Sequence, residues 1–205
     1  DTEVHNVQPR YGKLRSPGKD NVGFQNIELI SDATFEDWED WYKETKDTHP
    51  DGMLIGSIME SYEKGRWQEL AARCEAAGCD ALELNFSCPH GHPEKGMGAA
   101  MGQDPERVEE VTRWVVDAVN IPVWSKMTPN ITDITQPALA AQRGGAHGVS
   151  AINTILACIG INLKTLRPQP TVEGHSTFGG YSYLAVKPIA LRMVAQKKRS
   201  WQFII

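Results

Sequence analysis

The sequence contains no apolar run of the length that a membrane-spanning helix needs, which is about 20 residues. Residues 1–23 also lack the apolar core of a secretory signal peptide, so we expect a cytoplasmic protein without membrane contact. Basic residues are the minority, since 21 lysines and arginines stand against 26 aspartates and glutamates for a formal net charge of −5. This charge argues against nucleic acid as a partner, because nucleic-acid binding needs a basic surface.

Cysteine is scarce and scattered, which argues against metal clusters and disulfide scaffolds. No C-x-x-C pair is present among the four cysteines, which are Cys74, Cys79, Cys88 and Cys158. Zinc or iron–sulfur ligation would need tighter clustering. Two histidines, His90 and His92, stand close together in "PHGHP", but no H-E-x-x-H pattern supports them. We therefore predict reduced thiols and no metal site in this chain.

The chain is long enough for one sizeable core. It has 205 residues, of which 40% are hydrophobic and 23% charged, as in an ordinary globular domain. Residues 1–23 are polar and rich in glycine, proline and charge, which predicts an extended arm or linker. We assign residues 24–205 to a single domain.

Short apolar segments alternate with amphipathic ones along this domain. We predict strands over residues 53–59, 81–84, 121–127 and 147–152, and helices over residues 34–46, 66–77, 104–119, 133–143 and 188–198. Alternation of this kind predicts an α/β fold with a parallel sheet of the (β/α)8 barrel type. A whole barrel takes about 250 residues. The barrel is therefore expected to be incomplete, with the final "WQFII" as a candidate fifth strand.

Polar side chains follow each predicted strand, where barrel enzymes place their functional groups. They suit a planar polar ring, since amides offer both a donor and an acceptor, and a lysine can stabilise negative charge. Taken singly, each could be an ordinary turn residue, and a lone cysteine is more often a buried structural residue. Their recurrence at successive strand ends favours a functional reading of the set Asn85, Ser87, Cys88, Lys126, Thr128, Asn130, Asn153 and Thr154.

A glycine-rich stretch, "GMGAAMG" over residues 96–102, follows the first of these groups. It lacks the G-K-[ST] ending of a phosphate-binding P-loop and the G-x-G-x-x-G order of a dinucleotide site. We expect a mobile loop that can close over the site.

Six stretches carry a resemblance to a known family: "NIELIS", "ALELNFSCPHG", "GMGAAMGQDPE", "KMTPNITDI", "INTI" and "GGYSYLAVKPIAL". Together they resemble the flavin-binding, pyrimidine-reducing domain of the dihydropyrimidine dehydrogenases, and the bacterial subunit looks closest. The resemblance runs from about residue 21 to about residue 194. The wider group includes the dihydroorotate dehydrogenases, which share the N-x-S-C-P element.

The resemblance implies FMN chemistry on a pyrimidine such as uracil or thymine. It implies Cys88 as the proton donor, Lys126 as a residue at the flavin, and pyrimidine contacts by Asn26, Asn85, Phe86, Ser87, Asn153 and Thr154. Electrons would come from NAD(P)H through FAD and iron–sulfur clusters on a partner chain or on further sequence. We also expect an oligomer.

The resemblance has departures, and they leave alternatives open. We expect the first barrel strand and the loops that hold the FMN phosphate to lie outside this sequence, and the family has glycine where Tyr183 stands. One alternative is an enzyme of the dihydroorotate dehydrogenase type. Another is a truncated, non-enzymatic chain that binds no flavin.

Overall fold

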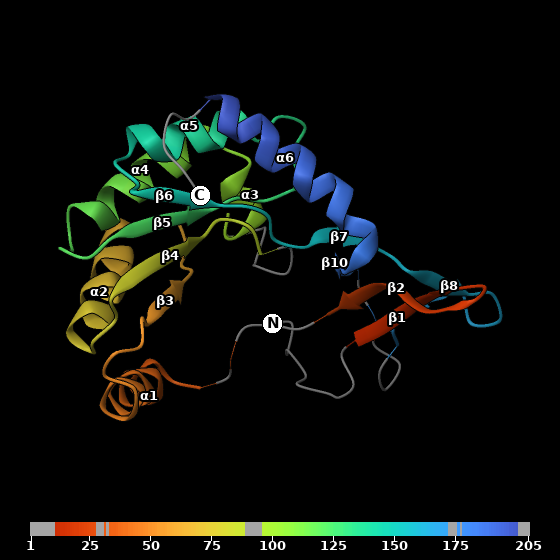
Figure 1. The fold of residues 1–205 in the computed structure, drawn as a ribbon, viewed down its shortest axis with the longest axis horizontal. Helices are drawn as coiled ribbons and strands as arrows, with labels where there is room; N and C mark the ends of the chain where they lie inside the picture. Colours follow the sequence, from red (N-terminus) through yellow and green to blue (C-terminus); the bar gives the residue numbers. More distant parts are fainter. Residues whose placement is uncertain are drawn as a thin grey trace.

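A parallel sheet forms the centre of the molecule. The structure, a computed structural model, describes residues 11–27, 31, 33–88, 96–171, 176 and 178–200. Four parallel strands lie side by side in sequence order: β3 (Ile55–Ile58), β4 (Ala81–Asn85), β5 (Val123–Lys126) and β6 (Gly148–Ser150) (Figure 1). The predicted α/β class and its four parallel strands are confirmed.

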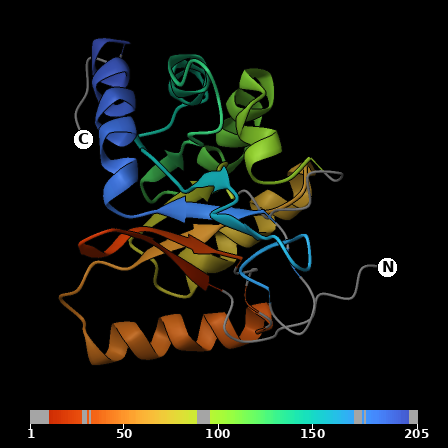
Figure 2. The ribbon, with the colours of Figure 1, turned by 90° about the vertical axis from the view of Figure 1, so that its right-hand side faces the viewer.

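Helices cover one face of this sheet. The connecting helices are α2 (Lys64–Ala76), α4 (Pro105–Val116) and α5 (Thr135–Arg143), and they lie outside the curved sheet (Figure 1). Helix α1 (Phe35–Thr48) lies on the other side of the sheets from α5 and from α6 (Lys187–Ser200) (Figure 2). The repeating strand–helix unit is that of a (β/α)8 barrel, and the chain holds part of one.

The strands alternate between a covered face and a polar face. In β4, Leu82 and Leu84 are fully buried, whereas Glu83 and Asn85 between and beyond them are half-buried. Strand β5 repeats the pattern, with Lys126 on the half-buried face. Because successive side chains of a strand point to opposite faces, the helices bury one set and leave the other for a polar interior.

The core lies between the sheet and its helices. Trp67 of α2 and Val108, Val111 and Val115 of α4 are completely buried there. The valines lie three and four positions apart, which places them on one side of α4. No helix among the described residues is long and apolar enough to cross a membrane.

A second sheet is antiparallel and joins distant parts of the chain. Its order is β1 (Tyr11–Ser16), β2 (Lys19–Asn26), β10 (Gly179–Ser182) and β7 (Ile155–Ala157). A separate hairpin pairs β8 (Gly160–Asn162) with β9 (Arg167–Gln169).

The N-terminal segment contains two strands. Residues 11–26 form a hairpin that pairs with β10, and the expected boundary at residue 23 falls inside β2. Pro17 and Gly18 make its turn, with Gly18 at φ 75°, a conformation that favours glycine. The division into an arm and a domain stays a prediction, and residues 1–10 and the candidate strand at 201–205 lie outside the described residues.

Candidate active site

The carboxyl ends of the central strands bring the predicted residues to one edge. The strand register aligns Asn85 of β4 with Lys126 of β5, and Lys126 with Ser150 of β6. The chain therefore leaves the sheet at the same level in three neighbouring strands. Ser87 and Asn153, which follow β4 and β6, come within hydrogen-bond distance although they are far apart in sequence.

Three of the predicted residues form one hydrogen-bonded group. The Oδ1 of Asn85 accepts from the backbone N–H of Ser87 at 3.2 Å and from its hydroxyl at 2.9 Å. The Nδ2 of Asn153 donates to the Ser87 hydroxyl oxygen at 2.9 Å. Ser87 is completely buried, so these contacts are shielded from water. The group holds two amide side chains in defined orientations at the strand ends.

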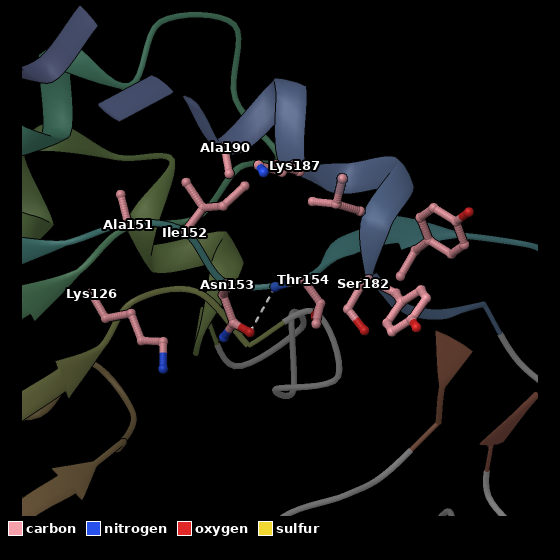
Figure 3. A pocket seen from close by; sticks show the side chains of 11 residues that line it. Lys126, Ala151, Ile152, Asn153, Thr154, Ser182, Lys187 and Ala190 are labelled. Atoms are coloured by element: carbon pink, nitrogen blue, oxygen red, sulfur yellow. Dashed lines mark hydrogen bonds between the residues drawn. The ribbon is translucent and has the colours of Figure 1, made fainter. Parts of the chain in front are cut away.

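A cavity of about 360 Å³ opens beside this group. Its wall comes from the end of β5, the segment after β6, the end of β10 and the start of α6: Lys126, residues 151–154, residues 181–183, Val186, Lys187 and Ala190. Figure 3 shows Asn153 and Thr154 between Lys126 on one side and Ser182 on the other. The wall contains two lysines and no carboxylate, so it favours electron-rich or anionic ligands.

Lys126 has a carboxylate partner. Its Nζ lies 3.1 Å from Oε2 of Glu83, and the hydroxyl of Ser150 donates to the other Glu83 oxygen at 2.7 Å. Glu83 was not among the predicted site residues. The signal was its position, an acidic residue in the middle of the otherwise apolar "ALEL" strand.

Asn130 holds the segment after β6 in place. Its Nδ2 donates to the Thr154 carbonyl at 3.3 Å, and its Oδ1 accepts from the Leu156 N–H at 2.9 Å. The side chain of Gln103 donates in turn to the Asn130 carbonyl at 2.8 Å. A single amide thus fixes the backbone on which Thr154 is presented to the cavity.

Asn26, another residue predicted to contact the substrate, lies at the end of β2 in the second sheet. It is paired with Gly180 across β2 and β10, and paired residues of an antiparallel ladder face the same side. A Cβ on Gly180 would lie 2.3 Å from the Thr154 hydroxyl oxygen, so Thr154 occupies that side too. The structure therefore places Asn26 on the face of the sheet that Thr154 covers.

Cys88 lies just beyond Ser87 and is half-buried. Its carbonyl accepts from the Ala99 N–H at 3.0 Å. A Cβ on Gly98 would approach that carbonyl oxygen to 2.5 Å, and Gly98 has φ 57°, so this position requires glycine. Cys88 is not part of the cavity wall but is held next to the Asn85–Ser87 group.

The sequence predicts a mobile loop for the glycine-rich stretch over residues 96–102, but part of this stretch is helical. Residues Ala99–Gly102 form the short helix α3, where Met101 and Gly102 are buried. Gly102 packs against the Phe86 carbonyl, which leaves no room for a side chain. Residues 89–95, including His90 and His92, lie outside the described residues.

The side chain of Phe86, a residue predicted to contact the substrate, lies in the core. Phe86 is completely buried in the core and packs against Trp67 with 5.9 Å between ring centroids. Alternation along β4 explains this, because Phe86 follows Leu82 and Leu84 on the helix-covered face.

Two of the other three cysteines are buried, whereas Cys158 is exposed. The buried pair is Cys74 of α2 and Cys79, which follows that helix; a hydrogen bond with Cys79 and burial raise the pKa of the Cys74 thiol. Within the described part of the chain, no three His, Cys, Asp or Glu side chains are grouped as metal ligands would be.

A sequence profile decides the family. The profile of the dihydroorotate dehydrogenase family matches residues 2–205, which is nearly the whole chain. The chain belongs to the dihydroorotate dehydrogenase family. The resemblance found in the strand-end motifs is therefore confirmed at the level of the family, together with its barrel-type fold.

Relatives within this family include dihydropyrimidine dehydrogenases. The chain is 54% identical over 198 residues to the chloroplastic dihydropyrimidine dehydrogenase (NADP(+)) of Arabidopsis thaliana, covering 94% of this chain and 46% of the relative. It is 42% identical to the NAD-dependent dihydropyrimidine dehydrogenase subunit PreA of Escherichia coli K12, covering 95% and 47%.

A dihydroorotate dehydrogenase is also similar. The catalytic subunit of dihydroorotate dehydrogenase B (NAD(+)) from Pyrococcus horikoshii is 41% identical, with 92% of this chain and 54% of the relative covered. The chain spans about half the length of the curated relatives it matches.

Proposed function

We propose that the chain is the substrate-binding part of a flavin-dependent dihydropyrimidine dehydrogenase, which reduces uracil or thymine to the 5,6-dihydropyrimidine. The observation that carries this proposal is the Asn85–Ser87–Asn153 group beside a cavity with Lys126 in its wall. The names and identities of the Arabidopsis and E. coli relatives support it.

The residues present fit a flavin ring. Proteins of this family bind FMN. An isoalloxazine ring carries carbonyl oxygens and ring nitrogens that need donors, and the cavity wall offers the Lys126 ammonium together with the hydroxyl of Thr154. Lys126 is thus the proposed flavin contact, and FMN supplies the hydride for the pyrimidine C6 when bound.

The pyrimidine has its own set of partners in this proposal. Its imide edge presents N–H donors and carbonyl acceptors, which amide side chains match in pairs. Asn85 and Asn153 are oriented for this by Ser87, and Thr154 and Asn26 lie on the adjoining face. Buried polar groups of this kind discriminate strongly against ligands that lack the matching hydrogen bonds.

Cys88 is the proposed general acid. Addition of hydrogen across the C5–C6 double bond needs a hydride at C6 and a proton at C5, and the thiol can donate that proton. The backbone contact to Ala99 holds Cys88 close to the residues proposed to bind the ring. The resulting thiolate is reprotonated from solvent after each turnover.

The test uses the full-length parent protein. Cys88→Ala is expected to lower turnover on uracil by roughly 10²–10⁴-fold, the range that general acids contribute. Cys158→Ala is the matched control, because this cysteine is exposed and its thiol contacts only the nearby Gly160 carbonyl at 3.3 Å among the described contacts. Unchanged turnover of Cys88→Ala would reject Cys88 as the acid.

Dihydroorotate oxidation is the second candidate. The family profile and the Pyrococcus relative favour it. The same amide groups could bind a pyrimidine that carries a carboxylate, which would find two lysines in the cavity wall. Turnover of the full-length protein on uracil and on dihydroorotate separates the two reactions.

The same proposal includes the source of the electrons, the partners of the chain and its location in the cell. We propose a partner subunit or further domain with FAD and iron–sulfur clusters that takes electrons from NAD(P)H, within an oligomer. The E. coli relative is named as a subunit, which supports assembly with another chain. A cytoplasmic location stays a prediction, and the Arabidopsis relative is named as chloroplastic.

A further inference from the structure

Glu83 is a charged residue in the middle of an otherwise apolar stretch of β4. Its neighbours in β4, Leu82 and Leu84, are fully buried, but Glu83 points to the opposite, polar face. Strands β4, β5 and β6 are neighbours in the sheet, and the Glu83 carboxylate of β4 contacts Lys126 of β5 and Ser150 of β6. This row of three side chains includes the last residues of β5 and β6, so it reaches the strand ends that carry the candidate site.

Both carboxylate oxygens of Glu83 are engaged. Oε2 lies 3.1 Å from the Lys126 ammonium, and Oε1 accepts from the Ser150 hydroxyl at 2.7 Å. The Glu83 side chain is 19% exposed and that of Lys126 is 32% exposed. The pair is therefore partly shielded, and solvent and salt weaken it less than a surface pair.

Lys126 is the only member of this row that lines the cavity. Its charge acts on whatever occupies the cavity, and a carboxylate at 3.1 Å offsets part of that charge. The strength of the positive field in the cavity thus depends on Glu83, although Glu83 itself is not in the cavity wall.

We propose that Glu83 is a positioning residue that fixes the Lys126 ammonium and sets the reduction potential of the bound flavin. The inference rests on the proposed function, since it concerns the flavin of the same cavity. A reduced isoalloxazine ring carries more negative charge than the oxidised ring, so a cation nearby favours the reduced form. With its carboxylate, Glu83 moderates this preference and keeps the flavin a stronger hydride donor.

The experiment measures the midpoint potential of the FMN in the full-length protein. Glu83→Gln removes the charge but keeps the shape and an acceptor for Ser150. It is expected to favour reduced over oxidised flavin about tenfold more than the wild type, which for a two-electron couple is a rise of about 30 mV. Glu83→Asp retains the charge and is expected to stay closer to the wild-type potential.

Two further variants make the result decisive. Glu109→Gln is the charge control, because Glu109 pairs with Arg113 and Arg143 on the helical side and should leave the potential unchanged. Glu83→Ala is the second charge-removing variant and should also raise the potential. A flavin-loaded Glu83→Gln protein with the wild-type potential would overturn the inference about Glu83 but not the proposed function. If neither charge-removing variant folded and bound flavin, Glu83 would have a structural role, and this result would also overturn the inference.

The proposed function fails in a different way. A wild-type full-length protein that holds no flavin, or that holds flavin which pyrimidines do not oxidise after reduction, would overturn that proposal. A wild-type protein that binds no flavin would also overturn the inference about Glu83, because that inference concerns the flavin. A changed potential in Glu83→Gln without pyrimidine turnover would support the inference and count against the substrate.

Discussion

Single amide side chains hold the candidate site together. Asn153 donates to Ser87 and accepts from the Thr154 N–H at 2.8 Å, so both ends of one side chain are used. Asn130 does the same between the Thr154 carbonyl and the Leu156 N–H. Each amide replaces contacts that a regular strand would have supplied. The segment after β6 therefore keeps a defined shape without belonging to the sheet at that point.

Tyr183 has a backbone conformation that is unfavourable for a residue with a side chain. It has φ 83° and ψ −163°, a region that is almost restricted to glycine and costs other residues about 1–3 kcal/mol. Its side chain is 53% exposed, so little packing is lost with it. We expect Tyr183→Gly to raise the free energy of unfolding by about 1 kcal/mol, after the greater freedom of unfolded glycine is subtracted.

Urea unfolding of the protein checks this expectation. Tyr183→Ala is the matched control, because alanine loses the ring but keeps the Cβ that makes the conformation costly. We expect no gain from it. Equal effects of the two variants would mean that the ring, and not the backbone, decides the outcome.

At the scale of elements, local sequence signals set where the helices begin. Helix α4 follows "DP", and the Asp104 carboxylate accepts from the N–H groups of Glu106 at 3.1 Å and Arg107 at 3.3 Å. Pro105 occupies the first turn, where its missing N–H is not needed. The helix predicted over residues 104–119 is confirmed at its start, with the cap that the sequence identified, but it ends at Val116. The buried face of α4 then packs on β5, where the Thr112 and Ser125 hydroxyls lie 3.2 Å apart.

Removal of this cap should cost stability. Asp104→Ala leaves two backbone N–H groups without their side-chain partner and is expected to lower the free energy of unfolding by about 1 kcal/mol. Asp117→Ala, at the other end of the same helix, is the control, since a negative charge there opposes the helix dipole. It should be neutral or slightly stabilising. Chemical denaturation of both variants measures the difference, and equal losses would contradict the role of the cap.

At the scale of the whole molecule, the two ends of the parallel sheet have different tasks. The carboxyl ends of the strands carry the cavity and the amide group. The amino ends are joined by Asp80, whose carboxylate accepts from the Leu54 N–H at 2.6 Å and from Lys46 of α1 at 3.0 Å. In barrel folds this division separates residues that serve function from residues that serve stability.

The contacts of Asp80 make stability depend on pH. The hydrogen bond from the Leu54 N–H, followed by that from Lys46, holds the pKa of Asp80 below the ordinary value of 3.8. A lowered pKa in the folded state stabilises the fold above the unfolded value, and this contribution is lost as the pH falls through the folded value. We expect Asp80→Asn to be less stable than the wild type at neutral pH, with the two curves converging below about pH 3.8.

Urea midpoints at pH 7, 5 and 3 would show the convergence. Asp51→Asn is the control, because Asp51 is exposed in the turn after α1. It should follow the wild type at every pH. A difference between Asp80→Asn and the wild type that persisted unchanged at pH 3 would exclude the carboxylate charge as its cause.

Sequence by itself determined the parallel part of the fold and most of the residues at its carboxyl edge. Apolar periodicity, the Asp104 cap and the strand-end positions of Lys126 and Asn153 are local properties of short segments, so they are visible without coordinates. The family followed from motifs around Cys88, and the profile match confirmed it.

Only the tertiary structure decided which distant residues these residues contact. The pairing of β2 with β10 joins segments more than 150 residues apart, as in the Phe24–Ser182 pair, and no local pattern specifies it. The partner of Lys126 is Glu83 because β4 and β5 lie side by side and put the two residues on the same face, two positions out of register. Phe86 is in the core because of the face on which β4 turns it. Contacts between distant segments depend on how the whole chain packs, whereas helices, strands and caps are specified by neighbours in the sequence.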